Sequence, residues 1–354
     1  VSRGSRALGS SPRLTLTAYF DSTEDLFFMP MIETINLTKR YGDLVALDSL
    51  NLALEAGDCF GFIGPNGAGK TTTIKILATL LKPSSGQAMI DGLTVGYQNR
   101  LIRPLIGYVP DFMGAYEDMV VTEYLEFFAA CYNIHGTQRK KVVGDVLDLT
   151  DLNYKATAEV NSLSRGMQQR LSIARVLLHD PKVLLMDEPA SGLDPRARIE
   201  IRELLKELKR MGKTIIISSH ILPELAELCN TVGIIERGKL LFSGSVDEAL
   251  RRARVGQTVH VQVADRTMAA AQLLQKLPGI AKVTIMDDTS SRSDKASGDG
   301  KIIQLAFDPE AKGGAGVSDI PNVLVNNSFR LLSFSEESVN LETAFMRLTK
   351  GAVQ

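Results

Sequence analysis

The sequence predicts an α/β fold built on a mostly parallel sheet, followed by a small α+β domain. Strand-like and helix-like segments alternate from residue 31 to about 250, which is typical of a sheet with parallel strands. The uninterrupted apolar run 183–186 and the segment 214–217, a threonine followed by three isoleucines, indicate strands buried on both faces. After about residue 250 the pattern changes, and 258–263 (TVHVQV) alternates as a half-buried strand does. We therefore expect two domains, 31–250 and 251–354.

Alternation or short apolar runs predict the strands, and apolar residues at helical spacing predict the helices. In the first domain the expected strands are 31–37, 44–54, 58–63, 106–109, 183–186, 214–217, 232–235 and 239–242. The expected helices there are 70–81, 122–134 with Thr122 as a candidate cap, 138–149, 166–178, 196–210 and 222–228. In the second domain we expect strands at 258–263, 281–286, 302–307 and 331–334 and helices at 268–277 and 341–348. Residues 287–300 have the composition of a linker.

Composition narrows the function classes. The 354 residues carry 40 Lys and Arg against 41 Asp and Glu, and 44% are apolar, as in a globular protein. The balanced charge argues against a dedicated nucleic-acid binder, and no apolar run is long enough to span a bilayer. The three cysteines, Cys59, Cys131 and Cys229, are widely spaced, so we expect neither a disulfide framework nor a zinc site.

Residues 1–30 differ from the rest of the chain. The opening stretch VSRGSRALGSSPR is rich in Ser, Gly and Arg, and no acidic residue precedes Asp21. This composition is compatible with a transit peptide, with a short disordered extension, or with a misassigned start for which Met29 or Met31 is the true first residue. We favour the extension or the misassigned start.

A phosphate-binding loop stands between an expected strand and an expected helix. Residues 64–71 (GPNGAGKT) fit the pattern G-x-x-x-x-G-K-[ST] in the required context. Glycines let the loop turn its N–H groups toward phosphate oxygens, and the helix N-terminus adds positive potential. Lys70 can reach the β- and γ-phosphates, and the Thr71 hydroxyl can ligate Mg²⁺. The nucleotide-binding candidates here are Asn66, Gly67, Gly69, Lys70, Thr71 and Thr72.

Two carboxylates follow a buried strand. The run 183–186 ends in Asp187 and Glu188, and ligands in open α/β sheets bind at the carboxyl ends of strands. We expect Asp187 to hold Mg²⁺ and Glu188 to accept a proton from the attacking water. An acidic pair alone is more often a helix cap, but the phosphate loop favours the catalytic interpretation.

Further motifs, taken in order, give the chain a strong resemblance to the ATP-binding cassette (ABC) ATPases over about 31–250. Residues 163–168 (LSRGMQ) resemble the family signature, usually written Leu-Ser-Gly-Gly-Gln, and 191–194 (SGLD) resemble the loop that follows the acidic pair. Tyr41 matches the aromatic that stacks on adenine, and His220 matches the switch histidine. The resemblance implies a phosphate-loop NTPase cassette with a parallel core, an antiparallel N-terminal β part and a helical subdomain.

The resemblance also implies how the cassette works. Two cassettes close head to tail around two ATP molecules with Mg²⁺, and hydrolysis releases them. In that arrangement Ser164 and Gly166 face the γ-phosphate of the partner's ATP, and Asp194 belongs to the same nucleotide-binding set. His220 contacts the γ-phosphate and, with Glu188 and Lys70, forms the catalytic set.

Three residues depart from the family pattern. Asp111 stands where the family has a glutamine after the strand 106–109, and Arg165 and Met167 replace a glycine and a glutamine of the signature. A carboxylate at 111 can still approach Mg²⁺ beside Thr71 and Asp187, but it adds negative charge near the phosphates. Since Ser164 and Gly166 are retained, we still expect hydrolysis.

The overall pattern is similar to bacterial two-component exporters, whose ATPase and permease are separate chains. That resemblance implies a peripheral protein on the cytoplasmic face of the inner membrane, bound to a separate transmembrane permease and not to nucleic acid. Residues 251–354 would be an accessory or regulatory domain. In the family the region 112–128 receives the permease, and its candidate contacts are Phe112, Met113, Tyr116, Met119, Val120 and Tyr124, although these could instead pack the helical subdomain. An ATPase that regulates a membrane or soluble complex without moving substrate remains the alternative.

Overall fold

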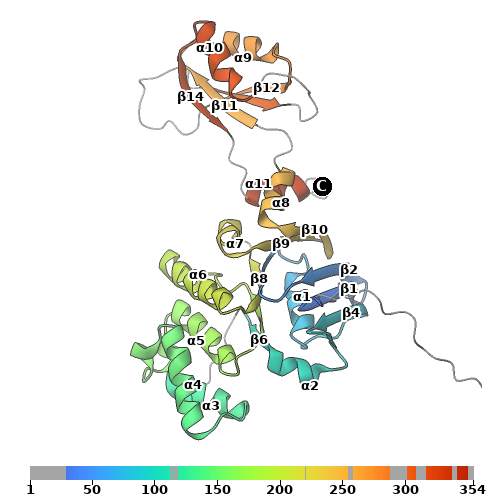
Figure 1. The fold of residues 1–354 in the computed structure, drawn as a ribbon, viewed down its shortest axis with the longest axis vertical. Helices are drawn as coiled ribbons and strands as arrows, with labels where there is room; N and C mark the ends of the chain where they lie inside the picture. Colours follow the sequence, from blue (N-terminus) through green and yellow to red (C-terminus); the bar gives the residue numbers. More distant parts are fainter. Residues whose placement is uncertain are drawn as a thin grey trace, which may run out of the picture.

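The chain forms two separate sheet-based regions joined through short helices (Figure 1). The computed structural model describes residues 29–111, 114, 119–219, 221–253, 258–287, 301–307, 316–336 and 341–349. The expectations for residues 1–28 and for the linker from 288 to 300 fall outside the described residues. None of the described helices is long and apolar enough to cross a membrane.

A six-stranded sheet forms the centre of the first region. Its strands are β3 (Cys59–Ile63), β6 (Ile106–Val109), β7 (Val183–Asp187), β8 (Thr214–Ser219), β9 (Thr231–Glu236) and β10 (Lys239–Ser245). The order is β10-β9-β3-β8-β7-β6, and every neighbouring pair is parallel except β10 with β9. Every residue of β7 and β8 is buried, because helices or a second sheet cover both faces. The predicted parallel α/β core is confirmed.

A four-stranded antiparallel sheet packs beside this core. It has the order β2-β1-β4-β5 and consists of β1 (Ile32–Tyr41), β2 (Leu44–Leu54), β4 (Ser85–Ile90) and β5 (Leu93–Thr94). The two first strands match the expected segments, whereas β4 and β5 were not predicted. With helix α1 (Lys70–Leu77) and the short α2 (Asn99–Ile102), this sheet encloses one of two apolar clusters that flank the central sheet.

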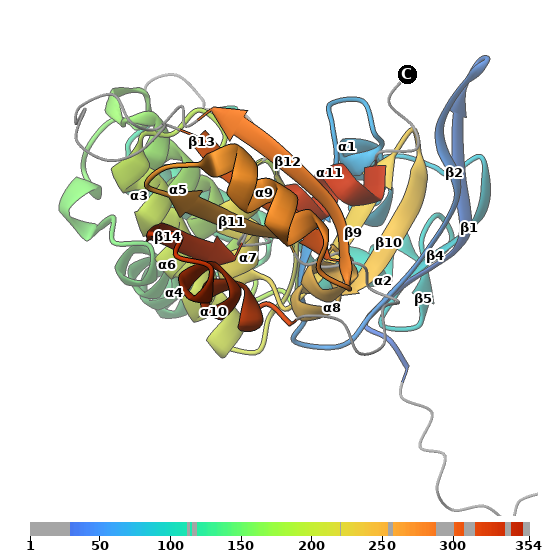
Figure 2. The same cartoon turned by 90° about the horizontal axis from the view of Figure 1, so that it is seen from above.

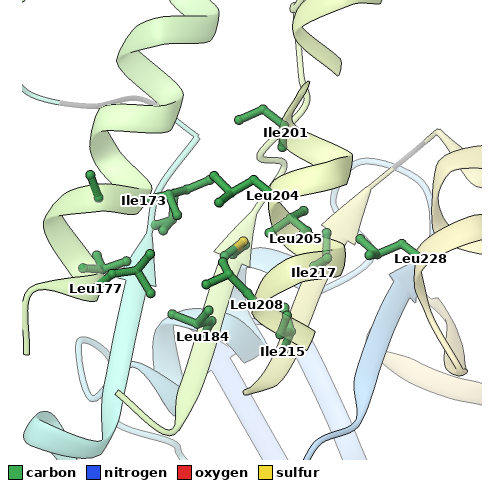
Figure 3. Close-up of a cluster of buried hydrophobic side chains, with 14 of the residues drawn as sticks. Ile173, Leu177, Leu184, Ile201, Leu204, Leu205, Leu208, Ile215, Ile217 and Leu228 are labelled. Atoms are coloured by element: carbon green, nitrogen blue, oxygen red, sulfur yellow. The ribbon is translucent and has the colours of Figure 1, made fainter. Parts of the chain in front are cut away.

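Alternate residues of the central strands supply both clusters. Leu184 of β7 and Ile215 of β8 pack under the helices α5 (Arg165–Leu177) and α6 (Pro195–Arg210), as Figure 3 shows, whereas Ile216 packs in the cluster on the opposite face. The helices α3 (Val121–Cys131) and α4 (Gly136–Leu149) complete the helical subdomain with α5. Thr122 was predicted to cap α3, but this was wrong: the cap is Val120, and the Thr122 hydroxyl donates to the Ala156 carbonyl at 2.7 Å.

The second region is a four-stranded antiparallel sheet of order β12-β13-β11-β14. Its chain order is β11 (Thr258–Val263), α9 (Thr267–Gln275), β12 (Ile280–Asp287), β13 (Lys301–Phe307), α10 (Asp319–Asn326) and β14 (Leu331–Glu336). This βαββαβ arrangement places α9 and α10 on one face of the sheet, over an apolar core (Figures 1 and 2). The expected α+β character is confirmed, while α10 was not predicted.

Three short helices lie between or beside the two regions. α7 (Leu222–Leu228) follows β8, α8 (Val246–Ala253) follows β10, and α11 (Leu341–Thr349) comes after β14. α11 contacts α8, α7 and β10. The chain therefore leaves the first region after α8, forms the second sheet, and returns with α11. Three 3₁₀ turns, Arg103–Leu105, Asn153–Lys155 and Val160–Ser162, complete the described elements.

Candidate active site

The phosphate loop has a backbone that only glycine permits at a critical position. Gly69 immediately precedes α1 with φ 115°. A Cβ atom there would lie 2.7 Å from Leu47 Cδ2 and 2.8 Å from the Ala46 carbonyl oxygen. Because both the torsion angle and the space exclude a side chain, Gly69 holds the loop closed against β2. The loop thereby presents the first turn of α1 toward the carboxyl ends of β3 and β7.

Lys70 folds back over its own loop. Its Nζ donates to the Gly64 carbonyl at 2.7 Å and to the Pro65 carbonyl at 3.3 Å, and lies 3.7 Å from Glu188 Oε1. The side chain is only 6% exposed. A buried ammonium group needs such partners, since desolvation without them is costly. The same donors can turn to phosphate oxygens.

Asp187, at the end of β7, is hydrogen-bonded to residues of α1 and β8. Its Oδ1 accepts hydrogen bonds from the Thr71 hydroxyl at 2.9 Å and from the Ser218 hydroxyl at 2.8 Å. The residue is 5% exposed and ends β7 opposite Ser218 of β8. Thr71 and Asp187, 116 positions apart in the sequence, are thus adjacent in space, as the motifs indicated.

Glu188 has a left-handed backbone, with φ 51°. This conformation costs a non-glycine residue roughly 1–3 kcal/mol and is common at functional sites. Its N–H donates to the Ser218 hydroxyl at 2.9 Å and to the Ser218 carbonyl at 3.2 Å, which holds the turn. Ser218, fully buried, therefore contacts both acidic residues. Its role was not predicted from the sequence. Ser218 directly follows the isoleucines 215–217, but only the pairing of β8 with β7 places it against Asp187.

These residues surround a hollow of about 380 Å³, a size suited to a small ligand. Its lining includes Pro65, Asn66, Gly67, Ala68, Gly69, Lys70, Thr71, Thr72, Asp111, Asp187 and Glu188. Every predicted residue of the phosphate loop and acidic pair is therefore brought together. Tyr41 is not among the lining residues; it ends β1, is 48% exposed, and has the Lys39 ammonium 5.1 Å from its ring centroid. His220 lies outside the described residues.

Asp111 joins this site from the end of β6. Its Oδ1 lies 3.9 Å from Nη2 of Arg165. Burial raises the pKa of the nearby Tyr108 phenol, and the negative charges of Asp187 and Asp111 add to the shift, so both carboxylates act on the same part of β6.

The signature residues lie together at the starts of α5 and α6. The Ser164 hydroxyl accepts from the Met167 N–H at 3.4 Å, and Asp194 Oδ1 accepts from the Ala197 N–H at 3.0 Å. A Cβ atom on Gly166 would lie 2.7 Å from Ala197 Cβ, so glycine allows the two helix starts to pack closely. Ser164, Gly166 and Asp194 do not line the hollow of this chain.

The side-chain oxygen atoms of the site are suitable ligands for a magnesium ion. Mg²⁺ binds through one or two carboxylates together with phosphate oxygens and water. Thr71 and Asp187 already share a hydrogen bond at which an ion could be held, and Asp111 lines the same hollow. No group of three or more His, Cys, Asp or Glu side chains in the described residues could enclose a metal by itself. The donor set therefore suits an ion completed by a bound nucleotide.

Fold and site together define a phosphate-loop ATPase, and comparison with known proteins gives the family. The family model described as ABC transporter matches residues 47–191. Nod factor export ATP-binding protein I of Ralstonia nicotianae is 33% identical over 320 residues, which are 90% of this chain and 94% of the relative. This chain belongs to the ABC transporter ATP-binding proteins.

Two further comparisons agree. Bacitracin transport ATP-binding protein BcrA of Bacillus licheniformis is 40% identical over 246 residues, covering 69% of this chain and 79% of the relative. The dimeric structure of a post-hydrolysis state of the ATP-binding cassette MJ0796, bound to ADP and Pi, superposes with a TM-score of 0.56 at 28% identity, covering 61% of this chain and 98% of that one. The chain is thus an ATP-hydrolysing subunit of the exporter type, and the predicted family, fold class and ATPase activity are confirmed.

Proposed function

We propose that two copies of this cassette, or this cassette and a related one, close around two ATP molecules and drive a separate transmembrane permease on the cytoplasmic face of the cell membrane. The observation that carries the proposal is the hollow in which Lys70, Thr71, Asp187 and Glu188 meet. The dimeric ADP-bound cassette similar to this chain and the exporter relatives support it.

Each residue of the site then has a role. Lys70 exchanges its loop carbonyls for β- and γ-phosphate oxygens, with Asn66, Gly67, Gly69 and Thr72 around them. Glu188 takes a proton from the water that attacks the γ-phosphorus, while the bond to the β-phosphate oxygen breaks. Bound Mg²⁺ would neutralise developing charge on the phosphates, held by Thr71, Asp187 and Asp111.

The remaining predicted residues act at the edges of this site. Tyr41 stacks on adenine, and its exposed position at the end of β1 leaves its ring accessible. Ser164 and Gly166 at the start of α5, with Asp194 at the start of α6, face the partner cassette's nucleotide. His220 contacts the γ-phosphate.

A groove of about 570 Å³ supports the permease contact. Its lining includes Arg100, Arg103, Tyr108, Phe128, Tyr132 and Arg175, from α2, its following turn, β6, α3 with its C-cap residue, and α5. Basic and aromatic side chains together suit a short helix with an apolar face and a carboxylate. The groove adjoins the nucleotide site through the end of β6, because Tyr108 lines the groove and the nearby Asp111 lines the hollow.

One of the residues predicted to contact the permease is instead buried in the helical subdomain. Tyr124 is fully buried, and its hydroxyl accepts from Arg175 Nη1 at 3.2 Å, so it packs the helical subdomain. Met119 and Val120 are partly buried. Phe112, Met113 and Tyr116 lie outside the described residues.

Affinity purification of tagged Glu188→Gln protein from solubilised native membranes, with ATP, tests the proposal. Mass spectrometry should find a stoichiometric polytopic membrane protein without its own cassette. Adding Arg103→Glu should reduce its recovery while ATP binding persists, whereas Lys182→Glu, at an exposed residue paired with Asp91 outside the groove, should not. Recovery of soluble partners alone would contradict the permease proposal and favour an ATPase that regulates another complex.

We also propose that the second domain comprises residues 258–336 and that α11 belongs with α8. The β11–β14 sheet has its own apolar core, and α11 contacts α8 and α7. In this proposal α11, which lies in the expected second domain 251–354, is part of the cassette. An accessory or regulatory role for the β11–β14 domain stays a proposal.

A further inference from the structure

We infer that Arg165 is a positioning residue for Asp111 and offsets its charge at the nucleotide site. These two residues are both departures of this chain from the family pattern, and they stand far apart in the sequence. In the structure they form an ion pair, Arg165 Nη2 to Asp111 Oδ1 at 3.9 Å. The inference rests on the proposed role of Asp111 at the metal side of the site.

The charges around the hollow explain why such a partner is needed. Its described lining carries three carboxylates, Asp111, Asp187 and Glu188, and a single ammonium group, Lys70. Asp187 is stabilised by two hydroxyl groups, and Glu188 lies 3.7 Å from Lys70. Asp111 would otherwise add a negative charge where a polyanionic nucleotide binds, and like charges so close together repel. Arg165 supplies the compensating cation.

The local structure favours this arrangement over a chance surface contact. Arg165 is the first residue of α5, fixed by the Ser164 cap. Its guanidinium rests against Gly192, where an added Cβ atom would lie 2.5 Å from Nη1. Glycine at 192 therefore makes room for the arginine. The pair thus links three segments: the end of β6, the start of α5 and the loop before α6.

The ion pair contributes little to folding. Both side chains are more than half exposed, at 58% and 55%, and such pairs have small effects on stability. Its effect is expected on a ligand, because the guanidinium, 3.9 Å from the Asp111 carboxylate, holds that carboxylate in place. Without Arg165 the charged carboxylate can turn toward a bound phosphate group and repel it. In the Asp111→Asn background there is no charged carboxylate to release, so loss of Arg165 should matter much less.

Binding of the fluorescent nucleotide MANT-ADP to the purified full chain tests this, with Mg²⁺ and with EDTA. Arg165→Gln should weaken binding roughly threefold to fivefold at low salt, the upper range for an exposed pair. The same change in the Asp111→Asn background should have less than about a twofold effect. Arg165→Lys should restore most of the affinity, and about 0.5 M salt should shrink the difference through screening.

The controls separate the outcomes. Lys182→Gln breaks an exposed pair with Asp91 that lies outside the hollow and should leave binding unchanged. If Arg165→Gln weakens binding equally in the parent chain and in the Asp111→Asn background, Arg165 acts elsewhere and the inference is overturned; no effect in either background also overturns it. Since MANT-ADP binding needs neither permease nor dimer, failure to find a permease leaves this test valid.

Discussion

The two sheet regions of this molecule differ in what they bury. At the carboxyl ends of β3, β7 and β8, the structure buries Lys70, Asp187 and Ser218, each with at least two polar partners. Among the described residues 258–336, the buried side chains are instead those of Val, Ala, Leu, Ile and Phe, with Thr267 as the one buried polar residue. Buried polar groups are costly unless hydrogen-bonded. In this molecule the candidate active site therefore lies where buried polar side chains are held by hydrogen bonds.

Replacing Lys70 in the first region should have the largest effect on ATP binding and hydrolysis. Lys70→Ala deletes the ammonium group of the hollow, so ATP binding and hydrolysis should fall together, by about 10- to 100-fold, as expected for lost hydrogen bonds to charged groups. Equilibrium binding and steady-state hydrolysis measure both. Unchanged ATP affinity would count against the assignment of the phosphate loop.

Ser218 tests whether the polar partners matter as well as the charges. Ser218→Ala removes the hydroxyl that contacts Asp187 and the Glu188 N–H, so we expect kcat to fall about tenfold. Ser218→Thr retains a hydroxyl and should retain most activity. Thr214→Ala is the matched control in β8, because the buried Thr214 hydroxyl accepts from the Gly57 N–H at the far end of the strand. Equal losses for Ser218→Ala and Thr214→Ala would indicate a general strand effect.

Replacing Asp111 should change ATPase activity less than replacing Lys70 or Ser218. Asp111→Gln restores the neutral amide of the family pattern and removes a carboxylate from the hollow, so ATPase activity should be preserved or raised. Hydrolysis rates at several Mg²⁺ concentrations measure this. A fall below about one tenth of the parent rate would show that the carboxylate itself is essential.

A core change in the second region should have the smallest effect on chemistry. Ile303 of β13 is fully buried, and Ile303→Ala should destabilise the β11–β14 region by about 2–5 kcal/mol. Nucleotide binding and basal hydrolysis should stay within about twofold of the parent. Calorimetry combined with an ATPase assay would show both, and a large loss of ATP binding would reveal coupling between the regions.

Most of the first region could be predicted from the sequence because its signals are local. Apolar runs predicted β7 and β8, and the spacing around residues 64–71 predicted the loop and α1. β4 was missed because its first three residues are exposed and its alternation is short, and α10 because Pro321 stands inside a short helix. Elements without a regular buried face leave little pattern to detect.

Within the site, what could not be predicted depends on tertiary contacts. The roles of Ser218 and of the Arg165–Asp111 pair arise from strands and helices that meet only in the fold. No local spacing places residues so far apart in the sequence against each other. The phosphate loop and acidic pair were predictable because each motif carries its own chemistry and its own element boundary.

The most direct test of the account is the behaviour of Glu188→Gln with Mg²⁺ and ATP. Losing a general base should lower turnover by about 10²- to 10⁴-fold, while ATP affinity is retained. Light scattering after size-exclusion chromatography should then show an ATP-dependent dimer that ADP does not support. Turnover near the parent rate would remove Glu188 from the base role, and a monomer under saturating ATP would contradict the paired-cassette proposal.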